Sequence, residues 1–167
     1  GEGKTLRANN YLQIINPLWC IDKYKIHKYF REIIELRNQL LNLDVNFCKH
    51  SPLKDLYSNT RIQYYPRGGG FMASHKDLRA ENVVKSLKIK KMSYIQVLFF
   101  LSKKNTDFKT GGGFIVKNNK RIIHDDHANS GDIIIYNGKV EHGVQTIDQD
   151  EVPNDNFKKL RGRFVLL

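Results

Sequence analysis

Two histidines and one carboxylate, contributed by distant parts of the chain, form the most informative pattern in this sequence. His75 and Asp77 stand at positions i and i+2, which on a β-strand project to the same face. His142 follows the apolar run Ile133-Ile134-Ile135 and a turn at Asn137-Gly138. Two histidines and one carboxylate hold Fe(II) on one face and leave the other coordination positions open. The pattern therefore predicts that His75, Asp77 and His142 are the metal ligands and catalytic residues of an iron site suited to oxygen chemistry.

A second His-x-Asp sequence, His124 with Asp126, competes for this role and has His127 beside it. Only 16 positions separate Asp126 from His142, against 65 between Asp77 and His142. The shorter interval leaves too little chain for the strands that lie between ligand strands in a closed barrel. Because polar clusters between strands are usually turns, we interpret His124 and His127 as turn residues.

The elements that must position these residues are mostly short strands. From residue 60 onward, β-like runs alternate with Gly, Asn and Asp turns, over 61–65, 71–75, 94–101, 114–117, 121–124, 132–136, 144–147 and 163–167. Helical spacing of apolar residues over 21–43 predicts one helix before them, and a short helix or loop is expected over 80–91. A helix followed by about eight strands predicts a mainly β protein with an N-terminal helix, built as a sandwich or a jelly roll and not from alternating βαβ units. The apolar run before His142 is expected to be a strand buried on both faces.

Size and composition bound the class of protein. A chain of 167 residues predicts one domain over 1–167, with a helical support region at about 1–58 and a jelly-roll catalytic core at about 60–167. A hydrophobic content of 40% excludes a disordered chain. No apolar run is long enough to cross a membrane, and the N-terminal residues form no apolar signal region. We therefore expect a cytoplasmic protein without a membrane partner.

The formal charge of +11 is compatible with a polyanionic partner or an acidic substrate. The lysines, however, are scattered along the chain and many stand beside turns, where lysine is an ordinary surface residue. Nucleic acid is therefore an alternative partner that we do not favour.

Several motifs together resemble the Fe(II)/2-oxoglutarate-dependent dioxygenase superfamily, the double-stranded β-helix oxygenases. They are His75-Lys76-Asp77, the block 131–144 with His142, the strand that begins Gly111-Gly112-Gly113, and the ending Gly162-Arg163-Phe164. The resemblance covers about residues 60–167. It implies a double-stranded β-helix (jelly-roll) barrel flanked by helices. It also implies Fe(II) on His75, Asp77 and His142, 2-oxoglutarate as co-substrate, and O₂.

The resemblance further implies that Arg163 binds the far carboxylate of 2-oxoglutarate. A guanidinium group suits this role because it donates two parallel hydrogen bonds to a carboxylate. Arg161 has the same strand parity and is the competing residue. We prefer Arg163 because it follows Gly162 and enters an apolar strand, where a buried arginine requires a partner. By the same resemblance Tyr65, or Gln63 beside it, lines the co-substrate pocket; an ordinary core tyrosine is the alternative.

The implied activity is hydroxylation of an unactivated C–H bond in a small polar molecule, such as an amino acid or a natural-product intermediate, with release of succinate and CO₂. Asp77 favours hydroxylation, or a related desaturation or cyclisation, over halogenation, because the halogenating branch of the superfamily carries a small residue at this position. Three alternatives stay open. They are a hydroxylase or demethylase acting on protein or nucleic acid, a cupin-like metalloprotein without 2-oxoglutarate, and a non-catalytic jelly-roll module that binds sugar or a protein partner.

Overall fold

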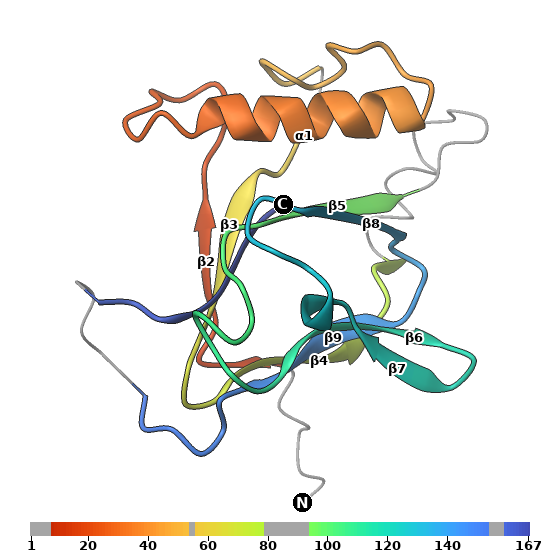
Figure 1. Ribbon diagram of the computed structural model, residues 1–167. Coiled ribbons are helices and arrows are strands. Elements are labelled where there is room, and N and C mark those ends of the chain that lie inside the picture. The colour runs from red at the N-terminus through yellow and green to blue at the C-terminus, as the bar shows by residue number, and fades with distance from the viewer. Residues whose placement is uncertain (1–7, 54–55, 79–93, 154–158) are drawn as a thin grey trace, which may run out of the picture.

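Two antiparallel β-sheets and one α-helix make up the computed structural model, which describes residues 8–53, 56–78, 94–153 and 159–167 (Figure 1). The first, the β4–β9 sheet, has the strand order β1-β4-β9-β6-β7. Its strands are β1 (Ala8–Asn9), β4 (Gly70–His75), β9 (His142–Ile147), β6 (Gly112–Lys117) and β7 (Lys120–Ile123). The second, the β3–β10 sheet, has the order β2-β3-β10-β5-β8. Its strands are β2 (Leu12–Ile15), β3 (Arg61–Pro66), β10 (Gly162–Leu166), β5 (Ile95–Phe100) and β8 (Ile133–Asn137).

The two sheets lie face to face, and the chain crosses repeatedly from one to the other (Figure 1). Strands β3 and β4 belong to different sheets, as do β5 and β6, β7 and β8, and β9 and β10. Alternate residues of each strand therefore point into the space between the sheets. In β3 and β10 these inward positions include Arg61, Gln63, Tyr65 and Arg163, which all line one pocket.

Helix α1 (His27–Leu40) covers the outer face of the β3–β10 sheet (Figure 1). Its apolar stripe follows the helical period, with Phe30, Ile33 and Ile34 packed against Val97 and Leu166 of the sheet. The Asp22 carboxylate accepts hydrogen bonds from the backbone N–H groups of residues 26 and 27, at 2.9 and 3.1 Å, which satisfies donors at the start of the helix. The apolar outer face of this sheet is thus buried by α1, and its inner face is free to carry polar groups.

The eight strands predicted from residue 60 onward are confirmed, each with bounds within two residues of those expected. The helix is present but shorter than 21–43, since α1 spans His27–Leu40. Its expected N-terminal position is wrong, because β1 and β2 precede it and pair with β4 and β3. The described part of 1–58 therefore contains β1 and β2 as well as α1. The helix or loop expected over 80–91 lies outside the described residues.

The apolar run before His142 is also less buried than expected. It forms β8, an edge strand of the β3–β10 sheet, and Ile133 and Ile135 are 43% and 40% exposed. Ile134 and Tyr136, on the other face, pack against Leu98 and neighbouring core residues. A strand with consecutive isoleucines is therefore buried on one face only, because its outer face lies outside the core cluster that packs against α1.

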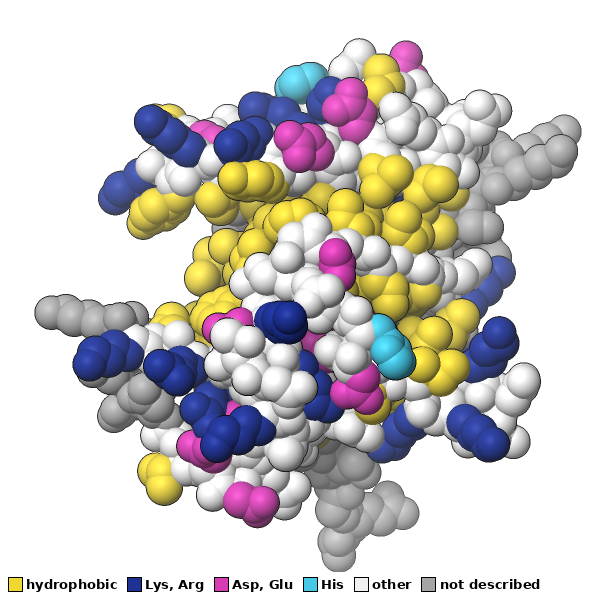
Figure 2. All heavy atoms as spheres, in the orientation of Figure 1, with side chains coloured by type: hydrophobic (Ala, Val, Ile, Leu, Met, Phe, Trp, Pro, Cys, Tyr) yellow, Lys and Arg dark blue, Asp and Glu magenta, His cyan; other side chains and the backbone are white. Residues whose placement is uncertain are grey.

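The surface seen in Figure 2 carries its hydrophobic side chains mainly between α1 and the strands beneath it. Lys and Arg side chains are spread over the helix and the lower part of this face, with Asp and Glu among them. No helix within the described residues combines the length and apolar character needed to cross a membrane.

Candidate metal centre

The structure brings His75, Asp77 and His142 together at one end of the β4–β9 sheet. His75 is the last residue of β4 and His142 the first of β9, and the two are direct partners in the antiparallel ladder. Asp77 lies two residues beyond the end of β4, where its backbone N–H donates to the Gly138 carbonyl at 2.9 Å. One ligand atom from each of the three residues lies within 4.8 Å of the others. Asp77 thus reaches the group from a loop and not, as expected, from the same strand face as His75.

Backbone carbonyls orient both imidazole rings. Nδ1 of His75 donates to the Ala73 carbonyl and Nδ1 of His142 to the Val140 carbonyl, each at 2.8 Å. A carbonyl only accepts, so each Nδ1 carries a hydrogen and each Nε2 is left to bind a metal ion. These Nε2 atoms lie 3.6 Å (His75) and 3.3 Å (His142) from the Asp77 carboxylate oxygens. Two imidazole Nε2 atoms and one carboxylate therefore lie close together, and the Nδ1 hydrogens of both rings are bonded to backbone carbonyls.

Charge interactions within this group favour an ionised Asp77. Burial alone would raise the pKa of Asp77, but hydrogen bonds from His142 and Gln96 bring it below its ordinary value. Gln96 Nε2 donates to Asp77 Oδ2 at 2.7 Å. Burial lowers the pKa of His142, but the hydrogen bonds with Asp77 and with the Val140 carbonyl and the charge of Asp77 together raise it above its ordinary value. A metal ion that binds His142 therefore competes with a proton for the imidazole.

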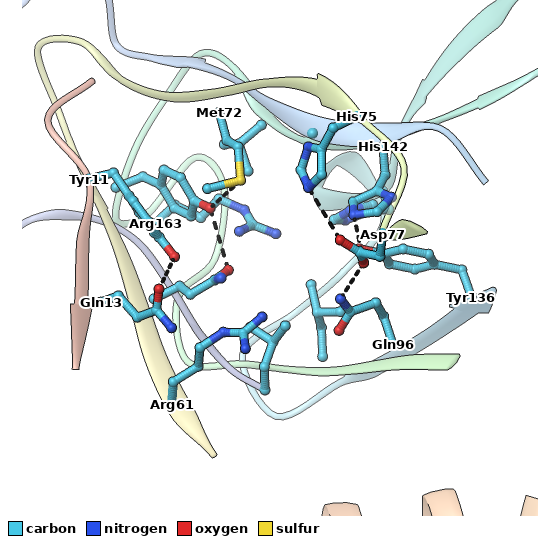
Figure 3. Close-up of a pocket in the computed structure, with 17 residues that line it drawn as sticks. Tyr11, Gln13, Arg61, Met72, His75, Asp77, Gln96, Tyr136, His142 and Arg163 are labelled. Atoms are coloured by element: carbon cyan, nitrogen blue, oxygen red, sulfur yellow. Dashed lines mark hydrogen bonds and ion pairs between the residues drawn. The ribbon is translucent and has the colours of Figure 1, made fainter. Parts of the chain in front are cut away.

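A pocket of about 520 Å³ opens from the candidate metal ligands into the space between the sheets (Figure 3). The β4–β9 sheet contributes His75, His142 and Met72, and the facing sheet contributes Tyr65 and Arg163 among others. This volume lies within the range of about 300–1,000 Å³ typical of small-molecule sites. The pocket thus joins the candidate metal ligands to the predicted co-substrate residues.

Arg163 is held in the pocket wall by Asp125. The side chain is 1% exposed, and its Nε lies 2.9 and 3.1 Å from the two Asp125 oxygens. Its Nη2 is buried and has no hydrogen-bond partner within the described residues. A Cβ at Gly113 would lie only 2.5 Å from this nitrogen, so the glycine makes room for the guanidinium group. Asp125 therefore fixes one edge of the guanidinium and leaves a terminal nitrogen for another acceptor.

Asp125 is itself held as a carboxylate. Its Oδ2 accepts the Gly113 N–H at 2.7 Å and lies 3.1 Å from His124 Nδ1. Burial opposes ionisation, but the charge of Arg163 and the contact with His124 lower the pKa of Asp125 to about 2. The pair with Arg163 is therefore ionic over the whole physiological pH range.

The other predicted co-substrate residues are placed as follows. Tyr65 is 1% exposed, lines the pocket, and donates a long hydrogen bond of 3.4 Å to Gln63 Oε1. Its ring centroid lies 5.7 Å from the Arg163 guanidinium carbon. Tyr65 is thus both a core residue and part of the pocket wall. Arg161, the competitor of Arg163, is exposed and does not line the pocket.

His124 was interpreted as a turn residue, but its side chain is buried in the pocket wall. His124 begins the 3₁₀ helix η1 (His124–Asp126), is buried, and lines the pocket, although it does not belong to the candidate metal group. His127, by contrast, is exposed. The neighbouring Asp125 was missed, and the signal for it was the need of a buried arginine for a carboxylate partner. Arg61 and Gln96 were also missed, because polar residues at alternate strand positions usually indicate a solvent-facing surface.

Comparisons of the chain with family models, with curated proteins and with solved structures found no match. The function is therefore inferred from the chemistry of the site itself.

Proposed function

We propose that this protein is an Fe(II)- and 2-oxoglutarate-dependent oxygenase that hydroxylates a C–H bond of a small polar molecule. One observation carries the proposal: a two-histidine, one-carboxylate group lines the same pocket as a buried arginine whose terminal Nη2 has no hydrogen-bond partner among the described residues. The first suits Fe(II), and the second suits the far carboxylate of the co-substrate.

The strand order supports a jelly-roll barrel of the double-stranded β-helix kind. Without the additional edge strands β1 and β2, four strands remain in each sheet, in the orders β3-β10-β5-β8 and β4-β9-β6-β7. In such a barrel the chain passes repeatedly between two facing sheets, and ligands bind in the space that the sheets enclose. The pocket and its metal ligands occupy that space here.

The donor set fits a divalent iron ion. His75 and His142 each present an Nε2 atom whose ring partner Nδ1 is already hydrogen-bonded, and Gln96 positions the Asp77 carboxylate. When bound, iron and 2-oxoglutarate together supply oxygen activation, with the co-substrate converted to succinate and CO₂. The carboxylate of Asp77 favours hydroxylation over halogenation, because the coordination position that a halide would take is filled.

The chain's own residues position the co-substrate and exclude water. Arg163 binds the far carboxylate of 2-oxoglutarate through its terminal nitrogens, while Asp125 holds the guanidinium in place. A carboxylate there would also satisfy the buried Nη2, which otherwise costs the free energy of an unmade hydrogen bond. Tyr65, Met72 and Leu98 form apolar parts of the wall and keep water from the reacting atoms.

Anaerobic absorption spectroscopy tests the proposal. Purified protein is titrated with Fe(II) and then with 2-oxoglutarate, and a visible charge-transfer band is expected. His75→Ala and Asp77→Ala are expected to abolish the band by removing a ligand. Arg163→Met is expected to raise the 2-oxoglutarate concentration at half-saturation by about 10-fold or more while iron still binds. Arg161→Met, at an exposed position, is the matched control and is expected to leave the titration unchanged.

Two results would contradict the proposal and redirect it. Iron binding without the band would support a cupin-like metalloprotein that does not use 2-oxoglutarate. Absence of both iron and co-substrate binding would make the His75–Asp77–His142 group a coincidence and would support a non-catalytic binding module. With the band in place, succinate release in the presence of amino acids, peptides or nucleic acid separates the substrate classes.

A further inference from the structure

Arg61 supplies a second positive charge to the pocket that the proposed mechanism does not use. It is the first residue of β3, and Figure 3 shows its side chain extending into the pocket, separate from the metal ligands. Its Nε is buried without a hydrogen-bond partner among the described residues. Arg163 and Arg67, by contrast, have carboxylate partners: Arg163 pairs with Asp125, and Arg67 pairs with Asp148 and Glu151. Within the described residues, Arg61 is therefore a pocket-lining cation without a carboxylate partner.

The side chains beside Arg61 are arranged to donate hydrogen bonds. Gln13 Oε1 accepts from the Tyr11 hydroxyl at 3.1 Å, and Gln63 Oε1 accepts from the Tyr65 hydroxyl at 3.4 Å. With each amide oxygen already engaged, the amide N–H groups of both glutamines are the donors left for a ligand. All of these residues line the same pocket. One wall therefore combines a guanidinium group with two amide donors, which is the chemistry that recognises an anion.

The charge of Arg61 acts on a neighbouring group inside the pocket. Burial raises the pKa of Tyr11, and the positive charge of Arg61 opposes that rise. Both residues line the pocket, and Figure 3 shows the Arg61 side chain extending into it.

The charges of the bound ligands lead to the same conclusion. In the proposed function 2-oxoglutarate brings two carboxylates, of which one belongs to the metal ion and the other to Arg163. Arg61 lies on a different strand and is left over. We propose that Arg61, with the amide groups of Gln13 and Gln63, binds a carboxylate of the substrate, so that the substrate is a small carboxylic acid such as an amino acid. This assignment rests on the proposed function.

The placement of Arg61 opposite the candidate metal ligands would determine which carbon of the substrate is oxidised. Arg61 lies on the β3–β10 sheet, whereas His75 and His142 lie on the facing sheet. A substrate held at Arg61 by its carboxylate extends across the pocket and presents a C–H bond to the metal side. The planar fork of a guanidinium group fixes both the position and the direction of a carboxylate.

Ligand-observed NMR tests this assignment with defined probes. The probes are small carboxylic acids, amino acids included, each paired with its primary amide, and the protein carries Zn(II) in place of iron and saturating 2-oxoglutarate. At least one acid is expected to bind about 10-fold or more tightly than its amide. In Arg61→Gln that acid is expected to lose about 10- to 100-fold in affinity, the range for one charge-assisted contact, and the preference for the acid should vanish. Arg121→Gln, an exposed residue on β7, is the matched control and should change nothing.

Three outcomes would overturn the assignment. They are a panel in which no acid is preferred over its amide, a preference that survives in Arg61→Gln, and a variant whose 2-oxoglutarate affinity falls, because Arg61 would then hold the co-substrate. Thermal unfolding excludes a trivial loss of structure. Since the guanidinium has no carboxylate partner among the described residues, Arg61→Gln should unfold at the same temperature as the wild type or higher. Failure of the proposed function looks different, because wild-type protein with Fe(II) and 2-oxoglutarate would then show no charge-transfer band.

Discussion

The buried Arg163–Asp125 pair provides a stringent test of how the pocket is built. In Asp125→Asn the Arg163 side chain stays 1% exposed but loses its counter-charge. Removal of one partner from a buried ion pair typically costs 3–5 kcal/mol, because the other charge stays buried. The asparagine side-chain oxygen can still accept a hydrogen bond from either Arg163 Nε or the Gly113 N–H. We therefore expect the free energy of unfolding to fall by about 3 kcal/mol, the lower end of that range. The measurement is urea unfolding at pH 7, compared with the wild type.

The pH dependence of this difference gives a second, independent number. Asp125 has a folded-state pKa of about 2, against an ordinary value of 3.8. A carboxyl group whose pKa is lower in the folded state stabilises the fold at pH values above its unfolded-state pKa. This stabilisation is lost as the pH falls through the folded-state pKa. For Asp125 the difference between the two pKa values corresponds to about 2 kcal/mol in total. Roughly 1 kcal/mol of this is lost by pH 3. The gap between wild type and Asp125→Asn should therefore narrow by about 1 kcal/mol between pH 7 and pH 3.

Asp126→Asn is the matched control for this experiment. Asp126 is the next residue and also has a cationic partner, since it lies 2.6 Å from Lys104 Nζ, but its side chain is 46% exposed. An exposed pair of this kind contributes about 0–1 kcal/mol. Equal destabilisation by Asp125→Asn and Asp126→Asn, or a gap that does not change with pH, would refute the role given to the buried pair.

Three further outcomes follow from the site. Gly113→Ala would place a Cβ 2.5 Å from Arg163 Nη2. We expect this contact to lower the free energy of unfolding by about 1–3 kcal/mol. Calorimetry should also show weaker 2-oxoglutarate binding, with the iron affinity unchanged. Gln96→Leu removes the 2.7 Å hydrogen bond to Asp77 and should weaken metal binding by about 10-fold or more in a competition titration. The pKa of His142 is raised in the folded state, so protonated His142 should stabilise the metal-free protein below about pH 6.5. This stabilisation should be lost as the pH rises through the folded-state pKa of His142. Urea unfolding from pH 6 to 8.5 should show the decline in the free energy of unfolding, and Asp77→Asn should lack it.

The sequence predicted the strands of this protein better than it predicted their surroundings. Short apolar runs between Gly and Asn turns are local signals, and all eight appear as β3 to β10. Strands β1 and β2 escaped because their identity depends on pairing with β4 and β3, far along the chain. The range 21–43 expected for the helix includes Tyr24, yet Tyr24 precedes α1 and is 71% exposed. Hydrophobicity indicated which residues belong to the fold but not which tertiary contacts cover them.

The candidate metal ligands were visible in the sequence, whereas most of the pocket was not. His75, Asp77 and His142 stand out because this combination of side chains and spacing has a specific chemical use. Arg61 and Gln96 look like the polar face of ordinary half-exposed strands. Their inward direction follows from α1, which buries the opposite face of the same sheet and so reverses the usual arrangement of polar and apolar sides. Asp125 was hidden for a similar reason, because its partner Arg163 is 38 residues away.

The division of labour between the two sheets has a consequence for experiments. Two of the candidate metal ligands lie on β4 and β9 and the third directly follows β4, whereas Arg61 and Arg163 lie on β3 and β10 of the facing sheet. Substitutions of the two arginines should therefore change the binding of anions while metal affinity stays the same. Gln96 is the exception, since it extends from β5 of the arginine-bearing sheet to the Asp77 carboxylate. A change in the distance between the two sheets would therefore act on the candidate metal ligands through the hydrogen bond from Gln96 to Asp77.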